Sequence, residues 1–290
     1  GVTGAVGQEM LDVLEARDFP LSGIRPLASE RSAGKTVQFK GEELPVEVLG
    51  QDSFSGIDLA LFSAGASISR EYAPLAVDSG AVVVDNSSAF RMDPEIPLVV
   101  PEVNSGAIAG HQGIIANPNC STIIMVVALQ PIQELSPLTR VVVSTYQAAS
   151  GAGAKGMDAL RRELAGEQLD DSPFPHRLAG NLVPRIDVVQ DDGYTKEELK
   201  MTLETRKIMG LGQVPISATC VRVPVERAHS ESIQVSTESP LDISAIREAF
   251  EKAPGLQVID DPHDDRYPTP LQAADQDDVF VGRLRQHPDE

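Results

Sequence analysis

A single cysteine stands where a polar turn meets a long apolar run. In the stretch NPNCSTIIMVVAL, residues 117–129, Cys120 is followed by Ser121 and Thr122, which are residue types that begin helices. A helix N-terminus lowers the pKa of a thiol, but the dipole alone contributes about 0.3–1 kcal/mol, which is less than one pKa unit. Cys120 is therefore a candidate nucleophile that needs a base, and the alternative is a small buried hydrophobic residue.

The second cysteine and the histidines supply one candidate base. Cys220 lies in ISATCVRVPV, where apolar side chains alternate, so we expect it in the core. His229 lies between two predicted strands, seven residues after Arg222, and is the best candidate for the base. The alternative for His229 is a solvated histidine in a turn. The histidines show no H-x₃-H spacing and two cysteines are too few for a zinc cage, so we predict no metal site.

Three further charged residues could bind a ligand. Arg91, in DNSSAFRMDPE, follows the end of a predicted strand, where parallel sheets place ligand sites. Glu197 and Lys200 are three residues apart and share a helix face. An ion pair within that helix would explain their spacing equally well. These residues alone do not identify a substrate.

The first residues, GVTGAVGQEML, have glycines at positions 1, 4 and 7, followed by an amphipathic pattern. A glycine-rich turn that opens a helix is half of a dinucleotide-binding fingerprint, whose other half is a preceding strand. About one β-α-β step later, LASERSAGK offers Ser29, Arg31 and Ser32 as donors suited to a 2′-phosphate. We therefore predict NADP as the cofactor, while Glu30 in the same loop keeps NAD open.

Short apolar strands alternate with helices up to Cys120 and change character after it. The first part predicts a parallel sheet with covering helices, whose strands we expect at 24–29, 58–65, 81–87, 97–103 and 113–118. The second part predicts an α+β domain with helices at 121–135, 196–209 and 242–253, alternating strands at 216–225 and 230–237, and a loop-rich stretch at 166–192.

Composition restricts the partners. The 43 acidic against 24 basic residues give a net charge of −19, which argues against binding nucleic acid or an anionic membrane surface. No apolar stretch approaches the roughly 18–20 residues that span a bilayer. Two cysteines far apart indicate a reducing compartment, so we expect a cytoplasmic protein. An anionic substrate would require the few cations to gather at its site.

With these residues assembled, the chain resembles the aspartate-β-semialdehyde dehydrogenases. The matching stretches follow the family's order over nearly all 290 residues, so the resemblance does not rest on one motif. They are TGAVGQEML, LASERSAGK, ALFSAG, VVVDNSSAFR, LVVPEVN, NPNCSTI, STYQAASGAG, EELKMTLETRKI and CVRVPVERAHSES.

The resemblance implies two domains. Residues 1–119 would form a Rossmann-like α/β domain with a mainly parallel sheet that binds NADP. Residues 120–290 would form an α+β catalytic and dimerisation domain with a mixed or antiparallel sheet, assembled as a homodimer or a dimer of dimers. For the cofactor we expect contacts from Gly1, Thr3, Gly4, Ala5, Val6, Ser29, Arg31, Ser32, Ser63, Gly65, Ser150 and Gly151.

The resemblance also implies roles for the candidate site residues. Cys120 would be the nucleophile, His229 the general acid/base, and Gln147 the residue that orients the substrate. Backbone N–H groups near Cys120 and Ser121 would hold the oxyanion. Arg222 would bind the substrate's α-carboxylate, and Glu197 would bind its amino group. The phosphate would be bound by Arg91, Lys200 and Asn119.

The implied reaction is the NADPH-dependent conversion of aspartyl phosphate to aspartate semialdehyde through a cysteine thioester, within the synthesis of lysine, threonine, methionine and diaminopimelate. The family normally has a first strand before the glycine-rich turn and a further helical segment near its C-terminus. We therefore expect this chain to be a fragment that lacks both. Three alternatives stay open: a sibling reductase of N-acetyl-γ-glutamyl phosphate, a non-catalytic dinucleotide-binding paralogue, and a cysteine hydrolase.

Overall fold

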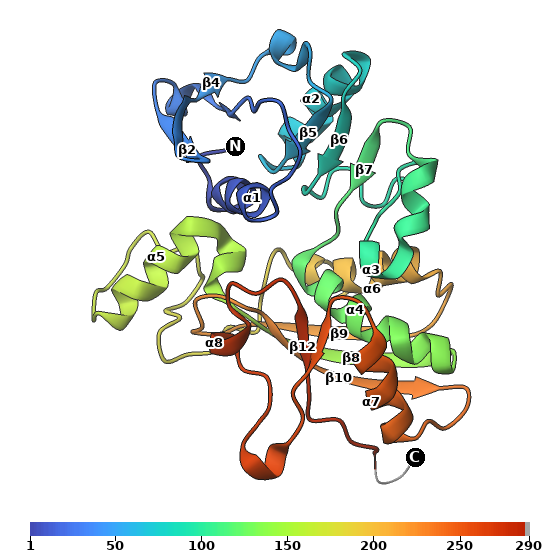
Figure 1. Cartoon of the computed structure of the whole chain (residues 1–290). Helices are drawn as coiled ribbons and strands as arrows, with labels where there is room; N and C mark the ends of the chain where they lie inside the picture. The colour runs from blue at the N-terminus through green and yellow to red at the C-terminus, as the bar shows by residue number, and fades with distance from the viewer. Residues whose placement is uncertain (288–290) are drawn as a thin grey trace. The chain divides into compact units, whose positions relative to one another are not determined.

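A computed structural model describes residues 1–287 and divides the chain into two compact units. The first unit contains residues 1–97 and 108–117, and the second contains residues 98–107 and 118–290. The sequence suggested a single domain boundary after residue 119. That residues 98–107 belong to the second unit was not expected. Figure 1 shows the helices and strands of both units, coloured along the chain.

The segment 97–103, expected to be a strand, is helical at its end. Pro101 begins the short helix α3 (Pro101–Asn104), and proline favours the first helical position because it lacks the N–H that would have no partner there. The Asn104 side chain accepts a hydrogen bond from the backbone N–H of Val100 and donates one to the carbonyl of Leu98, both at 2.9 Å. These local bonds override the apolar pattern.

The first unit is an α/β structure with parallel strand pairing, as predicted. Strands β5, β6 and β7 form a parallel sheet, β1 pairs with β4 in parallel, and β2 with β3 makes an antiparallel hairpin. The elements are α1 (Ala5–Ala16), β1 (Leu27–Ala28), β2 (Thr36–Phe39), β3 (Glu42–Pro45), β4 (Glu47–Val48), β5 (Leu59–Phe62), α2 (Ala66–Asp78), β6 (Val82–Asp85) and β7 (Ile114–Ala116).

The second unit is built on a mixed three-stranded sheet, which confirms the predicted class. Strand β8 is central, antiparallel to β10 and parallel to β9. Besides α3, the elements are α4 (Cys120–Leu135), β8 (Leu138–Gln147), α5 (Gly153–Leu164), α6 (Lys196–Met209), β9 (Ile216–Arg222), β10 (Ser230–Thr237), α7 (Ile243–Lys252), β11 (Leu256–Val258), α8 (Pro270–Ala273) and β12 (Val279–Val281).

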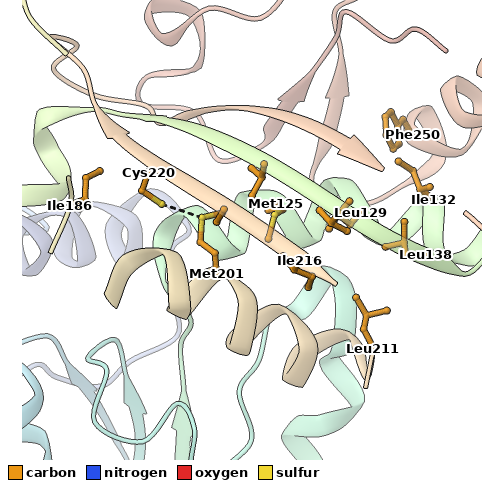
Figure 2. Packing of buried hydrophobic residues seen from close by; sticks show 13 residues of the cluster. Met125, Leu129, Ile132, Leu138, Ile186, Met201, Leu211, Ile216, Cys220 and Phe250 are labelled. Carbon is orange, nitrogen blue, oxygen red and sulfur yellow. Dashed lines mark hydrogen bonds between the residues drawn. The ribbon is translucent and has the colours of Figure 1, made fainter. Parts of the chain in front are cut away.

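Helices α4 and α6 cover one face of this sheet and bury the main apolar core (Figure 2). Met125 and Leu129 of α4 are fully buried, as are Met201 of α6 and Cys220 of β9, whose sulfurs lie 3.6 Å apart. The prediction that Cys220 is a core residue is confirmed. The helices within residues 1–287 are too short or too polar for any of them to cross a membrane.

The helix-covered face of the sheet changes from apolar to polar toward one end. Along β8 and β9 the paired residues are first Val143 with Ala218, then Thr145 with Cys220, and finally Gln147 with Arg222. Because side chains alternate along a strand, the members of each pair point to the same face as the pair before. The apolar core ends at the last pair, and Gln147 and Arg222 belong to a buried polar cluster at this end of the sheet.

We expect Met201→Ala to weaken the fold far more than a neighbouring substitution on the same helix. Met201 is fully buried, so truncation leaves a cavity and lowers the free energy of unfolding by about 2–5 kcal/mol. Leu203 is 43% exposed, and Leu203→Ala should change it by less than about 0.5 kcal/mol. Urea unfolding followed by circular dichroism measures both. Equal midpoints for the two variants would contradict the core assignment.

Candidate active site

The N-terminus of α4 carries Cys120 and is capped by the residue before it. Asn119 Oδ1 accepts hydrogen bonds from the backbone N–H groups of Ser121 at 3.0 Å and Thr122 at 3.3 Å. An asparagine at this position satisfies donors that have no partner within the first helical turn. The helix start predicted for Cys120 is therefore confirmed.

Of the two backbone N–H groups expected to bind the oxyanion, that of Ser121 is already used by the Asn119 cap. The Ser121 N–H already donates to Asn119 and also interacts with the Cys120 sulfur. Among the hydrogen bonds of residues 1–287, none uses the backbone N–H of Cys120. That group is the better-placed donor at this helix end.

Two buried carboxylates of α6 hold Asn119 in place. Glu204 Oε2 accepts a hydrogen bond from the Asn119 backbone N–H at 2.7 Å, and Glu197 Oε1 accepts one from the Asn119 side-chain amide at 3.0 Å. Both glutamates are at most 5% exposed. Sequence analysis missed Glu204, although its spacing of seven residues from Glu197 puts both on one helix face. The start of α4 is thereby fixed to α6.

Glu197 is the most connected side chain of the cluster. Its Oε1 also accepts a hydrogen bond from Gln147 Nε2 at 3.3 Å, and its Oε2 pairs with Lys200 at 3.1 Å. The ion pair within the helix, weighed as an alternative to a ligand role, is therefore present. The bonds to Asn119 and Gln147 go beyond such a pair, because they connect α6 to α4 and to β8.

Lys200 has a second acidic partner, Asp187, at 2.8 Å. Burial alone would lower the pKa of Lys200, but the two carboxylates raise it above its usual value. The same ammonium group lowers the pKa of Asp187 against the opposing effect of burial. Lys200 is thus charged, half-buried and held between two acids.

Arg222 is 6% exposed and fixed on several sides. Its backbone exchanges two hydrogen bonds with Val183, at 3.0 and 2.9 Å, and its guanidinium donates to the Ala148 carbonyl oxygen at 2.6 Å. The guanidinium also lies 5.9 Å from the centre of the Phe174 ring, within cation–π distance. The cation is therefore positioned before any ligand binds.

His229 follows a strained turn and is bonded to the end of β8. Ala228 has a φ of 67°, a left-handed conformation that costs a non-glycine residue about 1–2 kcal/mol. His229 Nδ1 accepts a hydrogen bond from the Ala148 backbone N–H at 3.0 Å. Burial, followed by the neighbouring Arg222, lowers the pKa of His229 to about 4. The imidazole is neutral at pH 7.

Gly151, one of the predicted cofactor contacts, packs against Arg222 and His229. A Cβ at Gly151 would lie 2.8 Å from Arg222 Nη1 and 3.2–3.3 Å from Cε1 and Nε2 of His229. Its neighbour Ser150 donates a backbone hydrogen bond to the Glu226 carbonyl at 3.0 Å. The glycine is required here because two polar side chains occupy the space beside it.

Cys120 is exposed, yet its thiol is not acidic. Desolvation by the protein atoms around the sulfur, together with the Glu197 carboxylate, raises the pKa of Cys120 to about 11 despite hydrogen bonds from Ser121 and the nearby Arg222. Within residues 1–287 no hydrogen bond joins Cys120 to His229. Both nevertheless interact with the same two charges, Glu197 and Arg222.

The glycine-rich turn of the first unit packs too closely for side chains. A Cβ at Gly7 would lie 2.6–2.7 Å from backbone atoms of Gly1 and Val2, and Val2 donates a backbone hydrogen bond to Leu27 at the start of β1. Gly1 lies near Ala64, in the loop after β5 that also contains Ser63 and Gly65. Gly4 caps α1, and Ala5 and Val6 begin it.

The loop after β1 is joined to this turn. The hydroxyl groups of Thr3 and Ser32 are 3.0 Å apart and hydrogen-bonded. Ser29 and Arg31, in the same loop, are exposed. The Ser/Arg loop thus lies beside the start of α1.

The loop after β6 carries Arg91 and is organised by a buried acid. Asp85 accepts hydrogen bonds from the side chain of Ser69 and from both the backbone and the side chain of Ser87, at 2.8–2.9 Å. Arg91 is 8% exposed and donates to the carbonyl oxygen of Asn86 at 2.9 Å. In the part of the chain that is described, His, Cys, Asp and Glu side chains form no group of three suited to a metal ion.

Both compact units match known domain models. The model of the semialdehyde dehydrogenase NAD-binding domain matches residues 1–111, and that of the semialdehyde dehydrogenase dimerisation domain matches residues 129–290. The first match covers the glycine-rich turn and the loop of Arg91. The second covers every member of the polar cluster except Asn119 and Cys120.

Curated relatives and solved structures agree with these domains. An aspartate-semialdehyde dehydrogenase of Aquifex aeolicus is 53% identical over 98% of this chain and 86% of its own length. The structure of aspartate semialdehyde dehydrogenase II from Vibrio cholerae, complexed with ASA, is 43% identical, with a TM-score of 0.94 over 100% of this chain and 88% of its own. That of the Candida albicans enzyme with NADP is 26% identical, with a TM-score of 0.74 over 99% and 88%.

The resemblance recognised from short motifs is thereby confirmed over nearly the whole chain. The identities of 53% and 43% are far above the level at which only a fold is shared. The matched regions include both the glycine-rich turn and the histidine-bearing loop. Since sequence, domain models and structure agree, the chain belongs to the aspartate-semialdehyde dehydrogenase family.

Proposed function

We propose that the chain catalyses the reversible, NADPH-dependent reductive dephosphorylation of L-aspartyl 4-phosphate to L-aspartate 4-semialdehyde, in the synthesis of lysine, threonine, methionine and diaminopimelate. The observation that carries the proposal is the buried polar cluster at the end of the sheet. It connects Asn119, beside the candidate nucleophile, with Gln147 and Glu197, and it includes Arg222 and His229.

Cys120 is proposed as the nucleophile. Its sulfur would attack the acyl carbon of the substrate, form a thioester and release phosphate. When bound, the nicotinamide cofactor supplies the hydride that reduces this thioester. His229 manages hydrogen bonding and protons at the reacting oxygen as the aldehyde forms and the sulfur is freed. The backbone N–H of Cys120 is proposed as an oxyanion donor.

The cations and amides of the site suit the charges of the substrate. Arg222 is proposed to bind the α-carboxylate, because its buried guanidinium offers a rigid fork of donors. Glu197 is proposed for the α-amino group and Gln147 for orientation. Arg91, Lys200 and Asn119 are proposed for phosphate, although the Asn119 oxygen is used by the helix cap, leaving only its amide for a ligand.

The first unit has features that fit NADP. Gly7 leaves room only for backbone at the turn, and helix N-termini with free N–H groups bind phosphates. Ser29, Arg31 and Ser32 would hold the 2′-phosphate, and the NADP-bound Candida albicans structure supports this choice. The remaining cofactor contacts are proposed at the glycine-rich turn, the loop after β5, and the Ser150–Gly151 loop.

A homodimer, or a dimer of dimers, is proposed from the dimerisation-domain match to residues 129–290. A cytoplasmic location is proposed because both cysteines are free thiols. The net charge of −19 disfavours nucleic acid and anionic membranes as partners.

The decisive assay is phosphate-dependent reduction of NADP⁺ with L-aspartate semialdehyde. If neither phosphate nor arsenate changed the rate, phosphate would not be the acceptor of the acyl group from an acyl-enzyme. N-acetylglutamate semialdehyde serves as the alternative substrate, and preference for it would redirect the proposal to the sibling reductase.

Cys120→Ala should lower kcat by at least about 10³-fold, because the proposed thioester forms on the Cys120 sulfur. NADPH binding, followed by fluorescence titration, should stay unchanged. Cys220→Ala is the control, since that thiol is a core residue and its loss should leave most activity. Loss of both NADPH binding and activity in Cys120→Ala would instead indicate a structural role.

Alkylation of Cys120 should remain slow at pH 7 and accelerate steeply with pH. Since the pKa of the thiol is about 11, the thiolate fraction, and with it the rate with iodoacetamide, should rise about tenfold per pH unit between about pH 7 and 9. Cys120→Ser provides the background from Cys220. A rate that levels off near neutral pH would show a preformed thiolate and overturn the expectation.

Arg31→Ala should reduce the preference for NADP. Removing a charged donor to the 2′-phosphate costs about 1.5–3 kcal/mol, so the ratio of kcat/KM for NADP to that for NAD should fall about 10- to 100-fold. Arg70→Ala, which removes an equal charge from an exposed position on α2, is the control. An unchanged ratio in Arg31→Ala would remove this residue from the cofactor site.

A further inference from the structure

The stretch 166–192, predicted to be rich in loops, is fixed to the end of α5. The buried side chain of Glu163 lies in the last turn of that helix. Its Oε2 accepts hydrogen bonds from the backbone N–H groups of Leu178 at 2.7 Å and Ala179 at 2.9 Å. A buried carboxylate is costly unless its oxygens have donors, so these bonds hold the middle of the stretch against the helix.

Phe174 lies in this stretch and packs between α5 and Arg222. The ring is part of a buried apolar cluster that consists of Ala149, Ala159, Leu160, Phe174, Leu178 and Val183. A Cβ at Gly156 of α5 would lie 3.2 Å from Cζ of the ring, so the tip of the ring packs against this helix. The guanidinium carbon of Arg222 lies over the ring, 5.9 Å from its centre. The ring is thus held from one side and contacts a cation on the other.

The guanidinium of Arg222 is a buried cation that the described part of the chain does not neutralise by an ion pair. Burial lowers the pKa of Arg222, and the Glu197 carboxylate opposes this effect. A guanidinium has five N–H donors, and within residues 1–287 its hydrogen bond goes to the Ala148 carbonyl oxygen alone. Lys200, by contrast, is paired with both Asp187 and Glu197. The two cations of the cluster are therefore stabilised in different ways.

An aromatic face and a carboxylate differ in what they take from a guanidinium. A carboxylate accepts its N–H groups, and a bidentate pair uses two of them. An aromatic ring attracts the cation through its quadrupole and leaves the N–H groups at the guanidinium edge for other acceptors. Phe174 thus offsets part of the cost of burying Arg222 without using the donors that a carboxylate ligand requires.

We propose that Phe174 is a positioning residue that selects substrates with an α-carboxylate, because its ring stabilises and orients the Arg222 guanidinium. The inference rests on the proposed function, in which Arg222 binds that carboxylate. The alternative is that Phe174 only fills the apolar cluster. A residue that only fills the cluster affects all substrates alike, whereas a residue that acts through Arg222 affects those that carry the carboxylate.

Phe174→Leu separates these roles with two aldehydes that differ by one group. L-Aspartate semialdehyde has the α-carboxylate, and 3-aminopropanal is the same molecule without it. Loss of a buried cation–π contact corresponds to about a 3- to 30-fold change, so kcat/KM for L-aspartate semialdehyde should fall by that factor. For 3-aminopropanal it should fall less than about twofold. If 3-aminopropanal turns over too slowly, its competitive inhibition constant is compared instead.

Leu160→Val is the matched control. It removes one buried carbon from the same cluster and keeps the ring of Phe174. The ratio of kcat/KM for the two aldehydes should therefore stay at the wild-type value in Leu160→Val and fall in Phe174→Leu. An equal fall for both aldehydes in Phe174→Leu, or no fall for either, overturns the proposal.

Fluorinated phenylalanines at position 174 keep the test decisive if Phe174→Leu does not fold. Site-specific insertion of 3-fluoro- and 3,5-difluorophenylalanine retains the ring and lowers the negative charge on its face stepwise. We expect kcat/KM for L-aspartate semialdehyde to fall with each fluorine, while the value for 3-aminopropanal stays nearly constant. The absence of such a trend overturns the proposal.

Failure of this inference is distinct from failure of the proposed function. The inference fails when substitutions of Phe174 leave the preference between the two aldehydes unchanged in a protein that still reduces NADP⁺ with L-aspartate semialdehyde and phosphate. The proposed function fails when the unaltered protein lacks that reaction, or when Cys120→Ala retains it.

Discussion

The Glu197 carboxylate is the interaction on which the second unit's functional end depends. It is 5% exposed and receives donors from three elements: the Asn119 amide before α4, the Gln147 amide at the end of β8, and the Lys200 ammonium on α6. A buried carboxylate is costly unless its lone pairs are satisfied. The same bonds that meet this requirement hold α4, α6 and β8 in one arrangement, and so position Cys120.

The two reactive side chains differ in what their surroundings allow. Glu197 and desolvation keep the thiol protonated, while Arg222 and burial keep the imidazole neutral. A neutral thiol and a neutral imidazole are a different resting state from a thiolate–imidazolium pair, in which each charge would stabilise the other. Under the proposed function, activation would therefore come with the substrate, whose phosphate could accept a proton and whose binding would alter the charge near Glu197.

Much of this site could be predicted from the sequence because residue type limits its chemistry. The helix start at Cys120 followed from Ser121 and Thr122, and the core position of Cys220 followed from alternation along its strand. What could not be predicted are bonds made by backbone atoms, such as the Ala148 N–H to His229 and the Asn119 N–H to Glu204. Every residue has such groups, so no residue type marks them.

The prediction of a strand at residues 97–103 was wrong for a related reason. Its apolar run is typical of a strand, but the outcome depended on Pro101 at the first helical position and on two bonds from the Asn104 side chain. Local capping of this kind outweighs a short hydrophobic pattern, which by itself cannot distinguish a buried strand from the approach to a helix.

The pairing of Glu197 with Lys200 bears on how an acidic protein can bind an anionic substrate. The proposed roles give these two side chains opposite ligand groups, the amino group and the phosphate. In the structure they neutralise one another, and Asp187 adds a second carboxylate to Lys200. A substrate that carries both charges can replace this pair on both sides and keep the buried charge balanced. A simple dianion cannot, because it would leave Glu197 buried with one donor fewer. Under the proposed roles, selection for the amino group would thus follow from the protein's own ion pair as well as from direct contact with Glu197.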